Sequence, residues 1–119
     1  MPKYDKGVAI LEKIVRYCGE IDALTNRFGK SYTTFKEDFA YQYACAMCIV
    51  QIGELASHLP EDFRATYNKV SWTQIRGMRN IFVHDYEKTD LLRMWNTIET
   101  DVPKLKAYCE SVLESISKN

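Results

Sequence analysis

Glycine and proline are scarce in this chain. Five glycines and three prolines punctuate 119 residues, and no stretch sustains the apolar–polar alternation of a half-buried strand. Internal repeats, linkers and low-complexity tracts are lacking as well. With 46% hydrophobic residues, the chain is expected to fold rather than stay disordered. These features predict one domain, residues 1–119, whose apolar residues follow helical spacing.

An excess of charge of either sign is also lacking. The 16 basic and 16 acidic residues give a formal net charge of zero. A protein that holds long nucleic acid by charge alone is normally basic, so any such contact here must depend on a local patch. Arg76, Lys88 and Arg93 could form that patch, and the alternative for Lys88 and Arg93 is a solvated surface.

Long apolar runs and a secretory signal are missing too. The longest apolar run, residues 43–50, is far too short to cross a bilayer, so we expect a cytoplasmic protein with no membrane contact. Cys45 and Cys48 form a Cys-x-x-Cys pair, but the sequence has no second pair at ligand spacing. We therefore expect reduced thiols that pack in a core, and we predict no metal and no cofactor.

Helical spacing predicts four longer helices and one short one. We place them at about residues 6–24, 35–58 and 61–67, from residue 71 onward, and from residue 90 to near the C-terminus. Capping boxes at Thr34 and Ser71 mark two of the starts, and Thr89 and Asp90, both good N-caps, mark a third. The stripe of the last helix keeps its phase across Pro103, which favours a kink over a separate element. The expected fold is an all-α, antiparallel four- to five-helix bundle.

The second of these helices is apolar on two sides. One stripe contains Tyr41, Cys45, Cys48, Ile52, Leu55 and Leu59, and the other contains Phe39, Tyr43, Met47 and Val50. A single bundle core needs only one stripe. The second stripe predicts burial elsewhere, and a homodimer interface is the simplest way to supply it.

Side chains that can contact phosphate or move a proton are concentrated in residues 76–86, Arg-Gly-Met-Arg-Asn-Ile-Phe-Val-His-Asp-Tyr. An imidazole, a guanidinium and an amide together suffice for metal-independent RNA cleavage, in which the ribose 2′-hydroxyl attacks the adjacent phosphate. The same groups could instead bind a nucleotide or cap a helix end. Arg79 and His84 lie about 140° apart on a helix. One phosphate can therefore meet both only if the helix ends near His84 or a second copy faces the first.

The pattern Arg-x4-His-x-Tyr, formed by Arg79, His84 and Tyr86, resembles the signature of the HepT-like family of the HEPN superfamily. The resemblance extends to Gln-Ile-Gly-Glu-Leu-Ala at 51–56 and to Trp-Asn-Thr-Ile-Glu-Thr-Asp-Val-Pro at 95–103. It implies a HEPN-like homodimer that is the toxin of a type II or type VII-like HEPN/MNT toxin–antitoxin pair. Such a toxin is a metal-independent endoribonuclease with a composite site at the dimer cleft. Its partner is a minimal nucleotidyltransferase antitoxin.

Roles in the site can be assigned on this basis. We expect Arg79 to bind the phosphate, His84 to transfer the proton and Asn80 to orient them. The resemblance implies that Tyr86 accepts AMP from the antitoxin, and added phosphate there would block RNA by bulk and by repulsion. Asp85 could make His84 more basic or could disfavour RNA.

Two questions remain open, each with two alternative answers. Glu54 is either a solvated residue or a carboxylate that orients Arg79 or Arg76 from a neighbouring helix. The chain as a whole is either the endoribonuclease described above or a non-catalytic module that binds a nucleotide or regulates a nucleotidyltransferase. His58, near a helix end, is expected to be a C-terminal cap rather than a ligand.

Overall fold

The computed structural model describes the backbone of residues 2–80 and 90–118, and the side chains of 5–80 and 90–118. All regular elements in these ranges are helical, so the all-α prediction is confirmed for them. They are α1 (Pro2–Phe28), α2 (Tyr32–Glu37), α3 (Phe39–Ser57), α4 (Glu61–Thr66), α5 (Trp72–Gly77), the 3₁₀ turn η1 (Met78–Asn80), α6 (Leu91–Asn96), the π-helical turn η3 (Thr97–Asp101) and α7 (Val102–Ser117).

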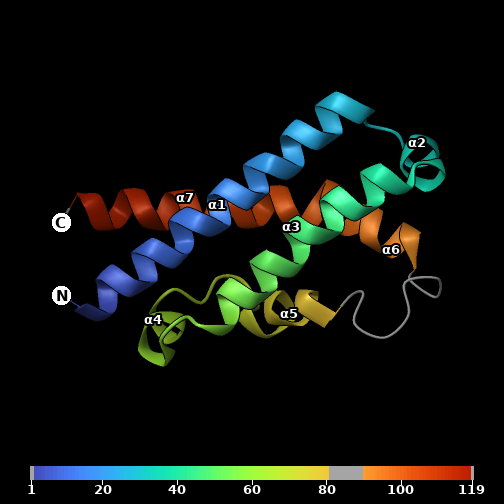
Figure 1. The fold of residues 1–119 in the computed structure, drawn as a ribbon. Helices are drawn as coiled ribbons and strands as arrows, with labels where there is room; N and C mark the ends of the chain where they lie inside the picture. The colour runs from blue at the N-terminus through green and yellow to red at the C-terminus, as the bar shows by residue number, and fades with distance from the viewer. Residues whose placement is uncertain (1, 81–89, 119) are drawn as a thin grey trace.

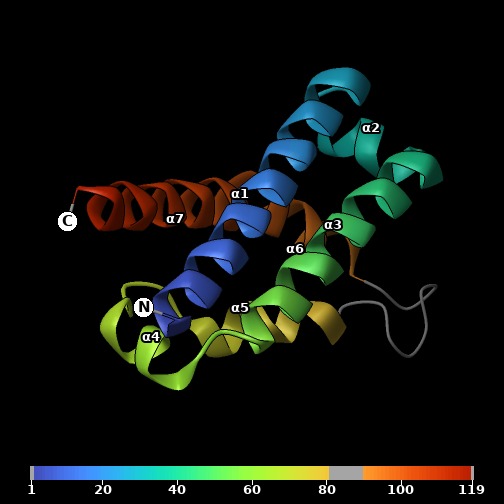
Figure 2. The ribbon, with the colours of Figure 1, turned by 60° about the vertical axis from the view of Figure 1, so that its left-hand side comes forward.

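The helix α3 is central to the bundle. Figure 1 shows α1 and α3 running side by side in opposite directions, with α7 crossing behind α1. On its other side α3 contacts α5 and η1, and Figure 2 shows α5 beneath the C-terminal half of α3. Along the part of the chain that the structure describes, no helix combines the length and apolar character needed to cross a membrane. Because η1 contains Arg79 and Asn80, this part of the candidate site lies against α3.

The predicted apolar stripes form the core. In α1 the stripe buries Ile10, Ile14 and Ile21, and in α7 it buries Leu105 and Cys109. An aromatic cluster joins four helices at one end of the bundle. Its members are Phe28 of α1, Phe35 of α2, Tyr41 of α3 and Trp95 of α6, with ring centroids 4.9 to 6.2 Å apart. Such ring pairs add about 0.5–1.5 kcal/mol each beyond the burial of their surface.

All four cysteines are buried in this core as free thiols, which confirms the expected packing role of the Cys-x-x-Cys pair. Burial raises the pKa of Cys18, Cys45 and Cys109 to about 12, and that of Cys48 to about 11. A thiol, unlike a thiolate, is a poor nucleophile and a poor metal ligand. These side chains therefore act as small apolar residues at neutral pH.

The expected single helix over residues 35–58 is wrong, because Asp38 divides it into α2 and α3. Asp38 has an extended backbone (φ −122°, ψ 102°), and its Oδ1 accepts hydrogen bonds from the N–H groups of Ala40 and Tyr41 at 2.9 and 3.2 Å. This is N-cap geometry. The start of α2 also differs from the prediction, since Ser31 rather than Thr34 is its N-cap.

The same break explains the buried amide on the apolar helix α3. Gln42 is buried, and its Nε2 donates to the carbonyl oxygens of Phe35 and Lys36 at 2.8 and 2.9 Å. Those carbonyls belong to the end of α2, where an α-helix leaves acceptors without partners. Gln42 therefore ties the end of α2 to α3.

A π-helical turn accommodates Pro103. The N–H of Val102 bonds five residues back to the carbonyl of Thr97, and Pro103 follows in the first turn of α7, where its missing N–H costs little. The backbone is helical without a break from Leu91 to Ser117, so the predicted continuity is confirmed. Pro103 and Asp38 together account for the difference between five predicted helices and seven α-helices in the described ranges.

Candidate active site

The helix that leads into the candidate site is short. Ser71 is its N-cap, as predicted, and its Oγ accepts a hydrogen bond from the N–H of Gln74 at 3.2 Å. The α-helix ends at Gly77, and Arg79 and Asn80 lie in the 3₁₀ turn η1. The expectation that one α-helix carries residues 76–86 is therefore wrong for Met78–Asn80, and residues 81–86 lie outside the described residues.

A 3₁₀ turn advances about 120° per residue instead of about 100°, so Arg76 and Asn80 do not share a face as they would on an α-helix. Residues 81–89 lie outside the described residues. They include the predicted proton-transfer residue His84, the predicted AMP acceptor Tyr86, and Asp85 and Lys88. The site is therefore built here from α3, α5 and η1.

The backbone of η1 lies directly on α3 at Gly53. A Cβ atom at this position would lie 2.5 Å from the backbone nitrogen of Arg79 and 3.1 Å from its Cα. Real Cβ atoms do not approach a backbone nitrogen so closely, so only glycine allows this contact. Gly53 therefore allows the backbone of Arg79 to pack directly against α3. Gly53 falls in the 51–56 segment of the family resemblance, but no role was predicted for it; a lone glycine in an apolar helix was the available signal.

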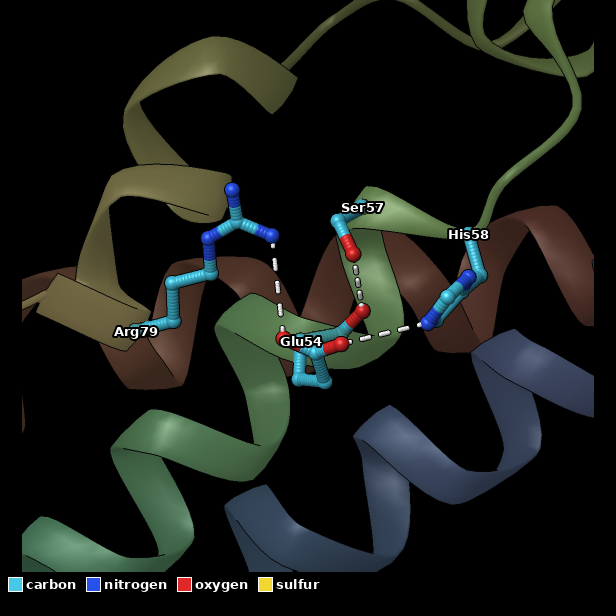
Figure 3. A network of polar contacts seen from close by, with 4 residues as sticks. All are labelled: Glu54, Ser57, His58 and Arg79. Carbon is cyan, nitrogen blue, oxygen red and sulfur yellow. Dashed lines mark hydrogen bonds and ion pairs between the residues drawn. The ribbon is translucent and has the colours of Figure 1, made fainter.

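Glu54, the next residue of α3, contacts two cationic or titratable side chains (Figure 3). Its Oε2 lies 3.6 Å from Nη1 of Arg79, and its Oε1 lies 3.2 Å from Nε2 of His58. Ser57 donates from its hydroxyl to the main-chain carbonyl of Glu54 at 2.5 Å. The structure thus brings Glu54 and Arg79 together, as one of the two hypotheses for Glu54 expected.

This network is open to solvent. The side chains of Arg79 and Glu54 are 42% and 50% exposed. Exposed ion pairs contribute about 0–1 kcal/mol to stability, so the main effect of this one is to orient the guanidinium. Glu54 engages Nη1, and the guanidinium has five N–H donors in a planar fork. Donors therefore remain for a phosphate.

His58 was not assigned to the site from the sequence. It occupies the C-cap position of α3, as expected, but its ring bonds Glu54 one turn earlier. The spacing of four residues between Glu54 and His58 was a usable signal, because such pairs meet on a helix surface. His58 thus extends the polar network to three side chains from α3 and η1.

Arg76 and Asn80 flank Arg79 in the sequence but make no hydrogen bond to the network of Glu54, His58 and Arg79. Arg76 is half-buried in the last turn of α5, and Asn80 is exposed at the end of η1. Among the described residues, no ion pair joins Glu54 to Arg76. Within the same residues, no three His, Cys, Asp or Glu side chains gather closely enough to hold a metal ion.

Comparisons with known proteins agree on one family. The family described as "Ribonuclease HepT-like" matches residues 14–112. The protein named "Putative RNase MJ1216" of Methanocaldococcus jannaschii is 31% identical over 116 residues, which are 98% of this chain and 93% of that protein. "Putative RNase MJ0125" of the same organism is 30% identical over 118 residues, 99% of each chain.

A third relative carries the family's name. "Probable ribonuclease HepT" of Thermococcus cleftensis is 28% identical over 81 residues, 68% of this chain and 74% of that protein. No solved structure matches the chain at a significant level.

Proposed function

Because the chain belongs to the ribonuclease HepT-like family, we propose that it is an endoribonuclease, and specifically the toxin of a HEPN/MNT toxin–antitoxin pair. The observation that carries this proposal is the position of Arg79. Its backbone is fixed on Gly53 and its guanidinium is oriented by Glu54, yet the side chain stays open to solvent. An oriented, accessible guanidinium is what a phosphodiester substrate requires.

The proposed reaction needs no metal. The 2′-hydroxyl of a ribose attacks the adjacent phosphorus, the bond from phosphorus to the 5′-oxygen breaks, and a 2′,3′-cyclic phosphate and a free 5′-hydroxyl result. Arg79 binds the phosphate and stabilises the charge that grows on its oxygens. His84 transfers the proton, because an imidazole can take or give one near neutral pH. Asn80 orients these groups.

A second copy of the chain would complete the site. Phe39, Tyr43 and Met47 follow one another at intervals of four on α3 and are 69%, 54% and 62% exposed. A row of large apolar side chains in water marks an interaction surface. The same face of α3 leads on to Glu54, one heptad after Met47. A symmetric contact along this row would therefore bring two Arg79 side chains toward one cleft.

Regulation is proposed to come from a minimal nucleotidyltransferase antitoxin that transfers AMP to Tyr86. Tyr86 is two residues from His84 in the sequence, so a phosphate there would lie beside the proton-transfer group. The added negative charge and bulk would exclude RNA. Co-expression with the antitoxin followed by intact-mass measurement tests this step. We expect added AMP in the wild type and none in Tyr86→Phe; AMP that persists in Tyr86→Phe would refute the assignment.

The nuclease activity is tested with purified, partner-free protein and RNA in the presence of a chelator. We expect cleavage by the wild type and a loss of at least about a hundredfold in Arg79→Ala and His84→Ala, because each removes a transition-state interaction. Arg16→Ala is the matched control, since Arg16 forms a comparable exposed pair with Glu20 on α1. If the wild type cuts no better than the Arg79 and His84 variants, the non-catalytic nucleotide-binding or nucleotidyltransferase-regulating module becomes the better description.

A further inference from the structure

A groove lies on the side of η1 that carries Asn80. It runs between α5 and η1 on one wall and α6, η3 and α7 on the other, and its volume is about 890 Å³. Pockets that bind small molecules have volumes of about 300–1,000 Å³. Its lining includes Ile75, Thr97 and Leu105, which are buried, and Met78, which is half-buried. The apolar side chains of Ile75, Met78 and Leu105 suit the face of a flat ring.

The rim of the groove carries three exposed carboxamides, from Gln74, Asn80 and Asn96. Among the residues that the structure describes, no hydrogen bond occupies these side-chain amides. Each carboxamide offers both donors and an acceptor. An edge that presents donors next to acceptors, as every nucleobase does, is therefore the natural counterpart of this rim.

The charges at the groove cancel. Arg93 and Lys104 line it, and so do Asp90 and Asp101. The carboxylate of Asp90 is already engaged, because its Oδ1 accepts a hydrogen bond from the N–H of Arg93 as the N-cap of α6. A balanced rim does not favour a bare phosphate, which needs an excess of cations. It favours an uncharged heterocycle.

Two further features connect the groove to the candidate active site. Asn80 lines the groove and directly follows Arg79 in η1, so the groove begins one residue from the proposed phosphate contact. The facing wall contains the π-helical turn, and such turns occur often at functional sites because they change the direction of side chains in a helix. In this chain Pro103 helps to fix the turn at this place.

We infer that this groove binds one nucleobase of a single-stranded RNA, adjacent to the phosphate held by Arg79, through the amides of Gln74 and Asn96. The inference rests on the proposed function and adds a base preference to it. The ring stacks over Met78 and Ile75, and the amides select among bases by the pattern of donors and acceptors on the edge. Recognition of splayed bases by stacking and edge hydrogen bonds is the usual way in which single-stranded RNA is read.

Equilibrium binding to short homopolymers of 2′-O-methyl RNA, which the proposed 2′-hydroxyl attack cannot cleave, tests the inference. The wild type is expected to bind one of the four hexamers at least about fivefold more tightly than another. Asn96→Ala and Gln74→Ala should weaken the preferred hexamer about tenfold and leave the least preferred one nearly unchanged, since a well-placed amide contact discriminates by about that factor. Asn26→Ala, which removes an exposed amide from α1, is the matched control and should bind as the wild type does.

Equal binding of all four hexamers by the wild type would overturn the inference, and so would unchanged binding by both groove variants. Neither result bears on the chelator-resistant cleavage assay, which tests the proposed function by itself. A protein that binds with base preference but cuts no RNA would retain the groove assignment and lose the nuclease. Circular dichroism of the variants, whose changed residues are exposed, excludes unfolding as the cause of weak binding.

Discussion

Arg79 is positioned by two neighbours on α3 that act in different ways. Gly53 removes the side chain that would otherwise keep the η1 backbone away, and Glu54 directs the guanidinium with a carboxylate. The first effect is steric and does not depend on salt. The second is an exposed charge interaction, which dissolved salt weakens. The position of Arg79 therefore depends more on Gly53 than on Glu54.

Gly53→Ala is expected to destabilise the fold by about 1–3 kcal/mol, the usual cost of forcing a group into a filled site. The new methyl would lie 2.5 Å from the backbone nitrogen of Arg79 and push η1 away from α3. Urea unfolding measures the change. Gly19→Ala is the control: no atom lies within 4 Å of its Cβ position in the interior of α1, so it should stabilise by about 0.5–1 kcal/mol. Equal effects in the two variants would contradict the steric account.

At this scale the sequence predicted some contacts and missed others. The pairing of Glu54 with Arg79 was one of two open hypotheses, because helix spacing could place Glu54 on a polar face but could not say which helix lies opposite. The role of Gly53 could not be predicted, since it depends on a backbone approach from η1, a segment 26 residues away. The place of His58 in the network could have been predicted from its spacing with Glu54.

Among the helices, the joint between α2 and α3 shows how one residue can define two elements. Asp38 leaves the helical conformation and caps α3, while Gln42 supplies donors to the end of α2. Both interactions are made within the turn itself. Hydrogen bonds from and to these two side chains therefore fix the orientation of α2 relative to α3, with only Asp38 between the two helices.

Asp38→Ala is expected to destabilise the protein by about 1 kcal/mol, the typical effect of removing an N-cap that accepts backbone N–H bonds. Thermal or urea unfolding gives the value. Asp101→Ala provides the control, because Asp101 also precedes a helix, α7, but its side chain makes no capping hydrogen bond. A change below about 0.5 kcal/mol is expected there. If the two variants lose the same stability, the capping bonds of Asp38 are not the cause.

Helical periodicity predicted which faces are buried better than it predicted where helices end. The stripes of α1, α3 and α7 lie in the core as expected, because burial of an apolar face is a property summed over many residues. The break at Asp38 and the early end of α5 at Gly77 each depend on a local competition between a helix and a cap. Helical periodicity does not predict the outcome of such a competition, because residues with helical spacing both precede and follow each boundary.

For the whole molecule, the surface that one copy leaves unexplained is the outer side of α3, where large apolar side chains are exposed. The inner stripe packs against α1 and α5, and the row formed by Phe39, Tyr43 and Met47 remains more than half exposed in one copy. The two-stripe pattern was visible in the sequence, and the structure agrees that only one stripe is buried within the described chain. We propose that a second copy of the chain covers the exposed stripe.

Light scattering at micromolar concentration is expected to show a dimer for the wild type. Met47→Glu should weaken it about a hundredfold, because the symmetric contact loses two buried methionines worth about 1.5 kcal/mol or more each. Leu92→Glu, which alters another exposed apolar residue, on α6, should leave the dimer intact. A monomeric wild type would refute the dimer, and a dimer that resists Met47→Glu but not Leu92→Glu would place the contact elsewhere.

Under the proposed toxin function, the backbone contact at Gly53 also distinguishes two ways in which the protein would lose toxicity in a living cell. The three heavy atoms nearest to a Cβ at Gly53 are the backbone nitrogen, Cα and Cβ of Arg79, and alanine at position 79 keeps all three. In a genetic selection for survivors, escape mutants at Arg79 should accumulate normal amounts of intact protein. Escape mutants at Gly53 should instead be depleted by proteolysis, as destabilised proteins are. Immunoblotting of the survivors would then sort inactivating substitutions from unfolding ones without any assay of RNA.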